Sequence, residues 1–150
     1  MSTTSELTRV LKKSRVSDVD SFLEDNSKKL IDSDNPFGEY MRSCIRGAGL
    51  KQQDVFIAAD ISEGYGYKLI SGEKHTRDRD VLIRLCIAAR LGLEGTQKAL
   101  KLYGMAPLYP RVARDAVLII AVNTGLKDVH EVNELLKEHG MEPLSEESDN

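Results

Sequence analysis

The side chains best suited to bind a ligand are a set of cations and hydrogen-bond donors between residues 51 and 77. Such side chains neutralise and hydrogen-bond phosphate oxygens in nucleic-acid-binding proteins. A glutamine at a helix start can meet a phosphate together with the free helix amides. Ordinary solvated charge is the other interpretation, and the residue types leave both open. The set comprises Lys51, Gln52, Lys68, Lys74, His75 and Arg77.

The distribution of charge along the chain favours a polyanion contact in the same region. The net charge is −3, which argues against a protein that coats nucleic acid indiscriminately. Residues 41–115 carry 13 basic and 8 acidic side chains, whereas residues 116–150 carry 2 basic and 8 acidic ones. Residues 1–40 carry 6 basic and 8 acidic side chains. A positive middle between negative ends predicts that the middle binds any polyanion.

No arrangement of residues in the sequence indicates catalysis, a metal or a cofactor. His75, His130 and His139 do not stand at metal-ligand spacing from one another. The segment from Gly64 to Lys74 lacks the spacing of a phosphate-binding loop, and the sequence contains no nucleophile elbow. We therefore expect a protein that is not an enzyme, with no cofactor and no metal site.

The two cysteines and the N-terminal residues indicate a cytoplasmic protein. Cys44 and Cys86 stand among apolar residues, which predicts two buried free thiols in a reducing compartment. The N-terminal run MSTTSELTRV has no apolar stretch typical of a signal peptide. No run of 18 apolar residues occurs, so we expect no membrane span and no membrane partner.

Apolar periodicity predicts an all-α protein. A core of Leu, Ile, Val and Ala, with few aromatic residues, favours helices over a β-sandwich. The run AVLIIAV at 116–122 is also assigned to a helix, because no comparable strand could pair with it. Proline and glycine near position 36 separate an N-terminal helical arm, 1–35, from a main helical domain, 36–142. An acidic tail, 143–150, follows and is expected to fray.

Two further runs combine arginine and aspartate. In LYPRVARD, residues 108–115, Arg111 and Asp115 are four residues apart, so a surface ion pair on one helix is the first interpretation. Arg114 and Asp115 could instead form a polar anchor between segments or a second phosphate contact. In RDRD, residues 77–80, Asp78 suits a helix start and the arginines can pair with neighbouring acids.

The run GLKQQDVFIAADISEGYGYKLISGEK, residues 49–74, resembles the Cro/lambda-repressor-type (XRE) helix-turn-helix family of bacterial and phage regulators. The resemblance covers roughly residues 40–103. It implies a lambda-repressor-like helix-turn-helix bundle, here with an N-terminal helical arm and two extra C-terminal helices. The residues at the family's positions in the two motif helices and their turn are Gln52, Val55, Ile61, Ser62, Leu69 and Gly72.

The resemblance implies a sequence-specific transcription regulator that binds double-stranded DNA, with a dimer expected. In such complexes the start of the second motif helix enters the major groove and its first side chains meet base edges. Ser62 is expected to cap that helix through its hydroxyl. The implied tip residues are Ser62, Glu63, Tyr65 and Lys68. The implied flanking residues are Lys51, Gln52, Lys74, His75 and Arg77.

Three positions depart from the family's pattern. Phe56 stands where alanine is usual, Asp60 where the turn has a glycine, and Gly66 where the second helix has an isoleucine. A glycine inside a helix costs about 1 kcal/mol relative to alanine. We expect Tyr65 or Tyr67 to supply the missing core contact, with the second helix rotated or shortened.

The tip residues also support an alternative function. They do not include the Arg–guanine or Asn/Gln–adenine pairings that carry most direct base readout. Glu63, the two nearby glycines and the acidic C-terminal third favour an interaction adaptor that keeps the helix-turn-helix fold without reading DNA. The apolar residues from Val117 to Val122, with the acidic helix after them, predict a surface for a homodimer or a protein partner.

Overall fold

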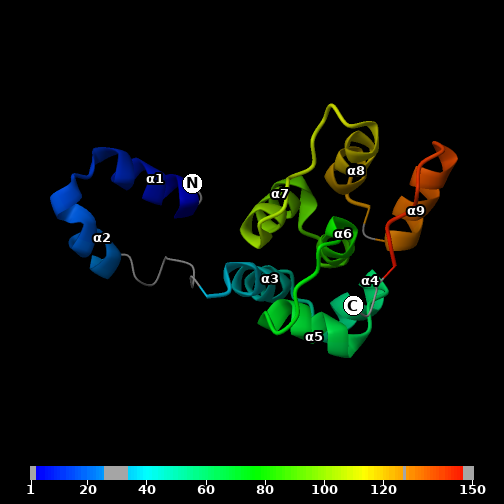
Figure 1. Cartoon of the computed structure of the whole chain (residues 1–150), viewed down its shortest axis with the longest axis horizontal. Helices are drawn as coiled ribbons and strands as arrows, with labels where there is room; N and C mark the ends of the chain where they lie inside the picture. The colour runs from blue at the N-terminus through cyan, green and yellow to red at the C-terminus, as the bar shows by residue number, and fades with distance from the viewer. Residues whose placement is uncertain (1–2, 26–33, 127, 147–150) are drawn as a thin grey trace. The chain divides into compact units, whose positions relative to one another are not determined.

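The chain divides into two compact units, Met1–Asp32 and Ser33–Asn150, in the computed structural model (Figure 1). The structure describes residues 3–25, 34–126 and 128–146. Residues 26–33, just before the domain boundary predicted at 35/36, and residues 147–150 of the predicted tail lie outside these ranges. The first unit contains α1 (Thr3–Lys13), the short 3-10 helix η1 (Val16–Asp18) and α2 (Val19–Asp25).

Helices are the regular secondary structure of the second unit in its described residues, which confirms the all-α fold class. No strand occurs in the described ranges, and residues 116–122 form part of a helix, as predicted. None of the helices in these ranges is both long and apolar enough to cross a bilayer. The helices are α3 (Pro36–Gly47), α4 (Gln52–Ala59), α5 (Glu63–Ser71), α6 (Arg79–Ala88), α7 (Gly92–Tyr103), α8 (Ala113–Asn123) and α9 (Val129–Glu138).

Polar caps and glycines determine where these short helices begin and end. The side chain of Asn35 accepts a hydrogen bond from the backbone N–H of Gly38, at 3.1 Å, and so caps α3. Asp78 and Asp128 cap α6 and α9 in the same way. Gly72 ends α5 in the left-handed conformation, with φ 85°. Asp78, which the sequence marks as a helix start, thus caps α6, and Gly72, which it marks as a helix end, ends α5.

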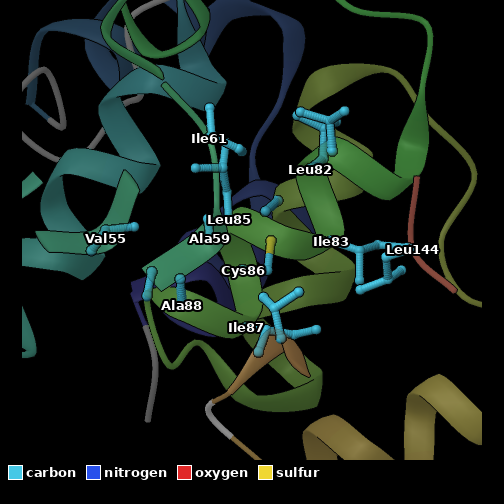
Figure 2. Packing of buried hydrophobic residues seen from close by; sticks show 14 of the residues in the cluster. Val55, Ala59, Ile61, Leu82, Ile83, Leu85, Cys86, Ile87, Ala88 and Leu144 are labelled. Atoms are coloured by element: carbon cyan, nitrogen blue, oxygen red, sulfur yellow. The ribbon is translucent and has the colours of Figure 1, made fainter. Parts of the chain in front are cut away.

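Helix α6 is the centre of the second unit, with α4, α7 and α9 packed against it (Figure 1). Every residue from Asp80 to Ala88 is buried. Their apolar side chains merge with those of α4 and of the C-terminal segment into one core, which Figure 2 shows from close by. A helix buried on all sides has no polar face, so the amphipathic pattern of a surface helix does not apply to α6.

A three-residue turn, Asp60–Ser62, joins α4 to α5. Asp60 adopts the left-handed conformation, with φ 57°, which aspartate tolerates better than most residues. The next residue, Ile61, is buried in the core. Aspartate therefore occupies a left-handed position at which the resemblance implied a glycine.

The two other departures from the family's pattern compensate each other. The ring of Phe56, on α4, lies against Gly66, on α5, where an added Cβ would come within 2.5 Å of a ring carbon. Phe56 is fully buried and fills the space beside the glycine. Tyr65 is also buried, whereas Tyr67 packs edge-to-face on the Phe56 ring with centroids 4.9 Å apart. The core contact that α5 lacks at Gly66 is thus supplied from α4.

Two Arg–Asp pairs connect the start of α6 to the start of α8. Arg114 donates two hydrogen bonds to the carboxylate of Asp80, at 3.0 and 2.8 Å, and Arg79 donates to Asp115. Such bidentate charge-assisted bonds are strong and orientation-specific. The prediction of an ion pair between Arg111 and Asp115 was therefore wrong. Arg111 precedes α8, so its spacing from Asp115 is not a helical spacing.

The buried side chain of Arg84 connects the C-terminal segment to the end of α4. Its guanidinium donates hydrogen bonds to the carbonyls of Ala59, Leu144 and Ser145, at 3.2, 2.9 and 2.6 Å. The Ala59 carbonyl lies in the last turn of α4 and has no partner within its own helix. Leu144 is buried among the side chains of the core (Figure 2). Residues 143–145 are therefore held against the second unit by these contacts, in contrast to the fraying expected for the acidic tail.

Asp80 has a second partner in the same segment. Its carboxylate accepts hydrogen bonds from the backbone N–H and the hydroxyl of Ser145, at 3.0 and 3.1 Å. Burial alone would raise the pKa of Asp80, but the hydrogen bonds from Arg114 and Ser145 outweigh it and lower the pKa below its ordinary value. The ionised carboxylate therefore stabilises the fold above the ordinary pKa of aspartate, and this contribution is lost as the pH falls through the lowered pKa.

We expect the substitution Asp80→Asn to lower the free energy of unfolding at pH 7 by about 3 kcal/mol, because it leaves the Arg114 guanidinium without its counter-charge. The variant should also lose less stability than the wild type as the pH falls from the ordinary pKa of aspartate through the lowered pKa of Asp80. Urea unfolding at pH 7, 4 and 3 measures both effects. Glu134→Gln is the control, since it removes an exposed pair with Lys137 worth less than about 0.5 kcal/mol. Equal costs for the two substitutions would contradict the interpretation.

The contact between Phe56 and Gly66 generates a second prediction. Gly66→Ala should destabilise the protein by about 1–3 kcal/mol, because the new methyl group collides with a ring that has no room to move. Gly64→Ala should instead stabilise it by up to about 1 kcal/mol, since nothing lies within 4 Å of a Cβ there. Chemical denaturation compares the two variants. In a Phe56→Ala background the penalty at position 66 should disappear, and its persistence would exclude the ring as its cause.

Candidate nucleic-acid interface

A groove lined by cations lies where α3, the start of α4 and α5 meet. It consists of two hollows, of about 430 and 350 Å³, which share Arg42 of α3 and Gln52 of α4. Arg46 and Lys51 line the first hollow, and Lys68 lines the second. We call this surface the basic groove, defined by Arg42, Arg46, Lys51, Gln52 and Lys68.

The packing of α3 on the end of α5 positions the basic groove. The Ile70 carbonyl accepts hydrogen bonds from Nδ2 of Asn35 at 2.7 Å and from the guanidinium of Arg42 at 3.4 Å. Carbonyls in the last turn of a helix need such outside donors. Gly38 permits the approach, because a Cβ there would lie 2.0 Å from the Ile70 oxygen. Arg42 is thereby held, half-buried, where the two hollows meet.

The outer face of α5 forms one side of the basic groove. Its solvent-accessible residues follow helical spacing, whereas Gly66, Leu69 and Ile70 face the core. Tyr65 is only 7% exposed, so it faces inward and does not present the base contact that the resemblance implied. Tyr67, at 43% exposed, is the tyrosine on the outer face. The accessible residues of α5 are Glu63, Gly64, Tyr67, Lys68 and Ser71.

Ser62 and Glu63 lie at the start of α5. Ser62 occupies the N-cap position, where its carbonyl accepts from the Gly66 N–H at 2.9 Å. Its hydroxyl does not accept the capping hydrogen bond that the sequence predicted. Glu63 is exposed and accepts a hydrogen bond from Nε2 of Gln53, on α4, at 3.4 Å. A carboxylate in the first helical turn is also favoured by the helix dipole, so Glu63 has a structural role beside any contact with a ligand.

The cations that follow α5 form a separate group from the basic groove. The Nζ atom of Lys74 lies 5.9 Å from the centroid of the Tyr65 ring, within the range of a cation–π contact. His75 stacks on Tyr103 of α7, with centroids 4.4 Å apart. Arg77 is exposed in the loop before α6. Of the six residues with phosphate-binding chemistry in the sequence, the structure brings Lys51, Gln52 and Lys68 together. The other three lie in the segment after α5, where His75 contacts α7.

Sequence reasoning missed Arg42 and Arg46. Both lie on α3, four residues apart, outside the stripe of its buried residues Phe37, Met41 and Ile45. The apolar stripe of α3 is evident in the sequence, and an i, i+4 pair of arginines outside that stripe was the signal available. What the sequence does not show is that this face of α3 borders the start of α4.

The basic groove has the chemistry to hold a phosphate. Guanidinium groups donate two parallel hydrogen bonds to phosphate oxygens, and Arg42 and Arg46 present two of them. The first backbone N–H groups of α4 lack helical acceptors and lie at the positive end of its dipole. Glu73 lines the second hollow and Glu63 begins α5. The first hollow, beside Arg46 and Lys51, therefore offers an anion the more favourable position.

Other reactive groups of the second unit have different surroundings. Cys86 is buried, and burial raises the pKa of its thiol to about 12, which keeps it protonated and unreactive. Cys44 is only half-buried, in contrast to the burial expected for both cysteines. Over residues 3–25, 34–126 and 128–146, no three His, Cys, Asp or Glu side chains are grouped closely enough to hold a metal ion.

Comparison with known proteins found no matching family model, no matching curated protein and no matching solved structure. The function proposed for the chain therefore rests on the geometry of the basic groove and of the outer face of α5.

The different burial of the two tyrosines predicts different effects on stability. Tyr65→Ala should lower the free energy of unfolding by about 3–5 kcal/mol, as expected for a buried aromatic side chain. Tyr67→Ala should cost about 1 kcal/mol, because it removes only one edge-to-face contact and half-exposed surface. Urea denaturation of the two variants gives both values, and a reversed order would show that the face of α5 has been assigned wrongly.

Proposed function

We propose that the chain is a sequence-specific DNA-binding transcription regulator, in which α4, its turn and α5 form a lambda-repressor-like helix-turn-helix. The observation that carries the proposal is the basic groove, which combines four cations and a helix start beside the accessible face of α5. The resemblance of residues 49–74 to the XRE family supports the same function. The proposed partner is double-stranded DNA, and no catalytic step or cofactor is part of the proposal.

The proposed mode of docking follows from which parts of α4 and α5 are accessible. The outer face of α5 enters the major groove, as the second helix of a helix-turn-helix does. The start of α4 then meets the phosphate backbone through Gln52 and its free N–H groups. Lys51 and Arg46 extend this contact along the strand. Phosphate contacts of this kind determine register and orientation, whereas base contacts determine sequence preference.

Base preference is proposed to come from Tyr67, Lys68, Glu63 and Ser71. Lysine donates to guanine O6 and N7, glutamate accepts from the cytosine amino group, and serine suits several bases. The aromatic edge of Tyr67 can contact a thymine methyl group. Glu63 also disfavours non-specific binding, because its carboxylate repels phosphates wherever its base partner is absent. A modest affinity for random DNA and a larger preference for one sequence are therefore expected.

We expect duplexes selected from a random pool to bind the full chain with an affinity that decreases steeply with salt. Four to five phosphate contacts correspond to a slope of log K against log salt of about −4. Removing one contributing cation, by Arg46→Ala, Lys51→Ala or Lys68→Ala, should reduce that slope by about 1. Fluorescence anisotropy between 50 and 200 mM salt measures the slopes.

Matched controls are Lys101→Ala on α7 and Lys137→Ala on α9, which remove exposed lysines far from the basic groove in the sequence and outside its lining. Both should leave the slope unchanged. Tyr67→Ala should weaken binding to the selected sequence more than binding to a random duplex. Failure of the chain to bind any duplex at 50 mM salt would exclude the proposal.

A specific observation also favours the adaptor function. Ile57, on α4, is 68% exposed and Tyr67 is partly exposed on α5, and Glu63 and Glu73 reduce the positive charge beside them. In this alternative, the helix-turn-helix is a packing unit for a protein contact. For any purified candidate partner, Ile57→Asp should abolish binding and Arg46→Ala should not. The reverse pattern, with DNA as the ligand, would favour the regulator.

The C-terminal helices offer less surface for a partner than their sequence suggested. Most of the apolar run at 116–122 is used in the core, where Leu118, Ala121 and Val122 are buried. Ile120, at 60% exposed, is the principal apolar side chain that α8 leaves to solvent. A dimer or partner contact through α8 and α9 stays a prediction, centred on that residue.

A further inference from the structure

Within residues 3–25, most of the large apolar side chains are in contact with solvent. Val10, Leu11, Val16, Val19 and Leu23 are all exposed, and Val16 is 91% exposed. They account for half of the large apolar side chains that are exposed in the described parts of the chain. Contiguous exposed apolar surface in a soluble protein marks a contact with a partner.

Four of these five side chains line one hollow. The pocket has a volume of about 400 Å³. Five of its lining residues are apolar, with Leu11 from α1 and Val16, Val19, Phe22 and Leu23 from η1 and α2, and the other three are Ser14, Arg15 and Asp18. Within residues 3–25, α1 and α2 do not pack along each other. Each helix therefore presents an apolar stripe that the other helix does not cover.

A unit of this size also needs a partner in order to be stable. Helices as short as α1, with 11 residues, and α2, with 7, are marginal in isolation. Units below about 40 residues generally require disulfides, metals or oligomerisation to fold. The first unit contains no cysteine or histidine in its sequence, which leaves association as the available means.

The charges of the first unit indicate which partner fits. Helix α1 carries Arg9, Lys12 and Lys13 against the single acid Glu6, whereas η1 and α2 contain only acidic charged residues. Those acids are Asp18, Asp20, Glu24 and Asp25. DNA or an anionic membrane would be repelled by α2, and a uniformly acidic or basic protein would complement only one of the two helices. A surface that presents an acidic helix to α1 and a basic helix to α2 complements the charges of both.

We propose that the first unit pairs with the first unit of a second copy of this chain, with α1 of each copy lying along η1 and α2 of the other. A two-fold axis makes such an interface isologous, so one set of contacts occurs twice. The pairing covers both apolar stripes and places the basic face of α1 against the acidic face of α2. It is independent of the proposed DNA binding, because it involves no residue of the second unit.

The first test is the mass of the full chain in solution. Analytical ultracentrifugation should give a dimer for the wild type. Leu11→Asp, which places a charge in the pocket of both copies, should raise the dissociation constant of the dimer by about a hundredfold or more. Ile120→Asp is the matched control, because it introduces the same charge at an exposed apolar residue of α8 and should leave the dimer intact. Circular dichroism should show the helices of the second unit unchanged in both variants.

Charge exchange tests the identity of the partner. Lys12→Glu with Lys13→Glu changes the net charge of α1 from +2 to −2, and Asp20→Lys with Glu24→Lys changes that of α2 from −3 to +1. Each double variant alone should dimerise about tenfold more weakly than the wild type at low salt. An equimolar mixture should form heterodimers with the affinity of the wild type or better, because both contacts then join opposite charges.

Three results would overturn the proposal. One is a monomeric wild type at concentrations of tens of micromolar. Another is a dimer that Ile120→Asp dissociates and Leu11→Asp does not, which would locate the interface on α8. The third is a mixture of the two charge variants that associates no better than either variant alone.

Discussion

Helix α6 carries two charged side chains into the interior. The partners that these charges require fix the positions of several other segments of the second unit. A buried charge is tolerated only where an opposite charge or several hydrogen-bond partners meet it. Asp80 meets Arg114 at the start of α8 and Ser145 near the C-terminus. Arg84 meets the carbonyls at the end of α4 and of Leu144. One buried helix thus locates the start of α8, the end of α4 and the C-terminal segment at once.

The same constraint extends to the basic groove through α4. Arg84 holds the last turn of α4 at Ala59, and Phe56, one turn earlier, packs directly on Gly66 of α5. The orientation of α5 is therefore set by contacts on its inner face, and its outer face is left for a partner. In the proposed regulator, the position of the residues that meet DNA depends on a core that DNA never touches. That separation allows the outer side chains to vary without loss of the fold.

The two proposals assign different surfaces of the chain to different partners. The basic groove belongs to the second unit, whose middle region carries the excess of positive charge. The apolar pocket belongs to the first unit, whose charges are segregated between α1 and α2. A two-fold pairing of the first units would give each pair of chains two basic grooves. Two grooves per assembly suit an operator with two half-sites, although each property can be present without the other.

The sequence by itself determined the features that depend on neighbouring residues. Caps such as Asp78, glycines such as Gly72 and the apolar spacing along the chain predicted the all-α class and the helix at 116–122. Only the tertiary structure decided which face of each helix is buried and which distant groups meet. In the folded protein Tyr65 faces the core and Tyr67 faces solvent, and Asp115 pairs with Arg79, which lies 36 positions earlier in the chain. The physical reason is that capping and periodicity act within a few residues, whereas the rotation of a helix and the partner of a buried charge depend on packing between segments far apart in the chain.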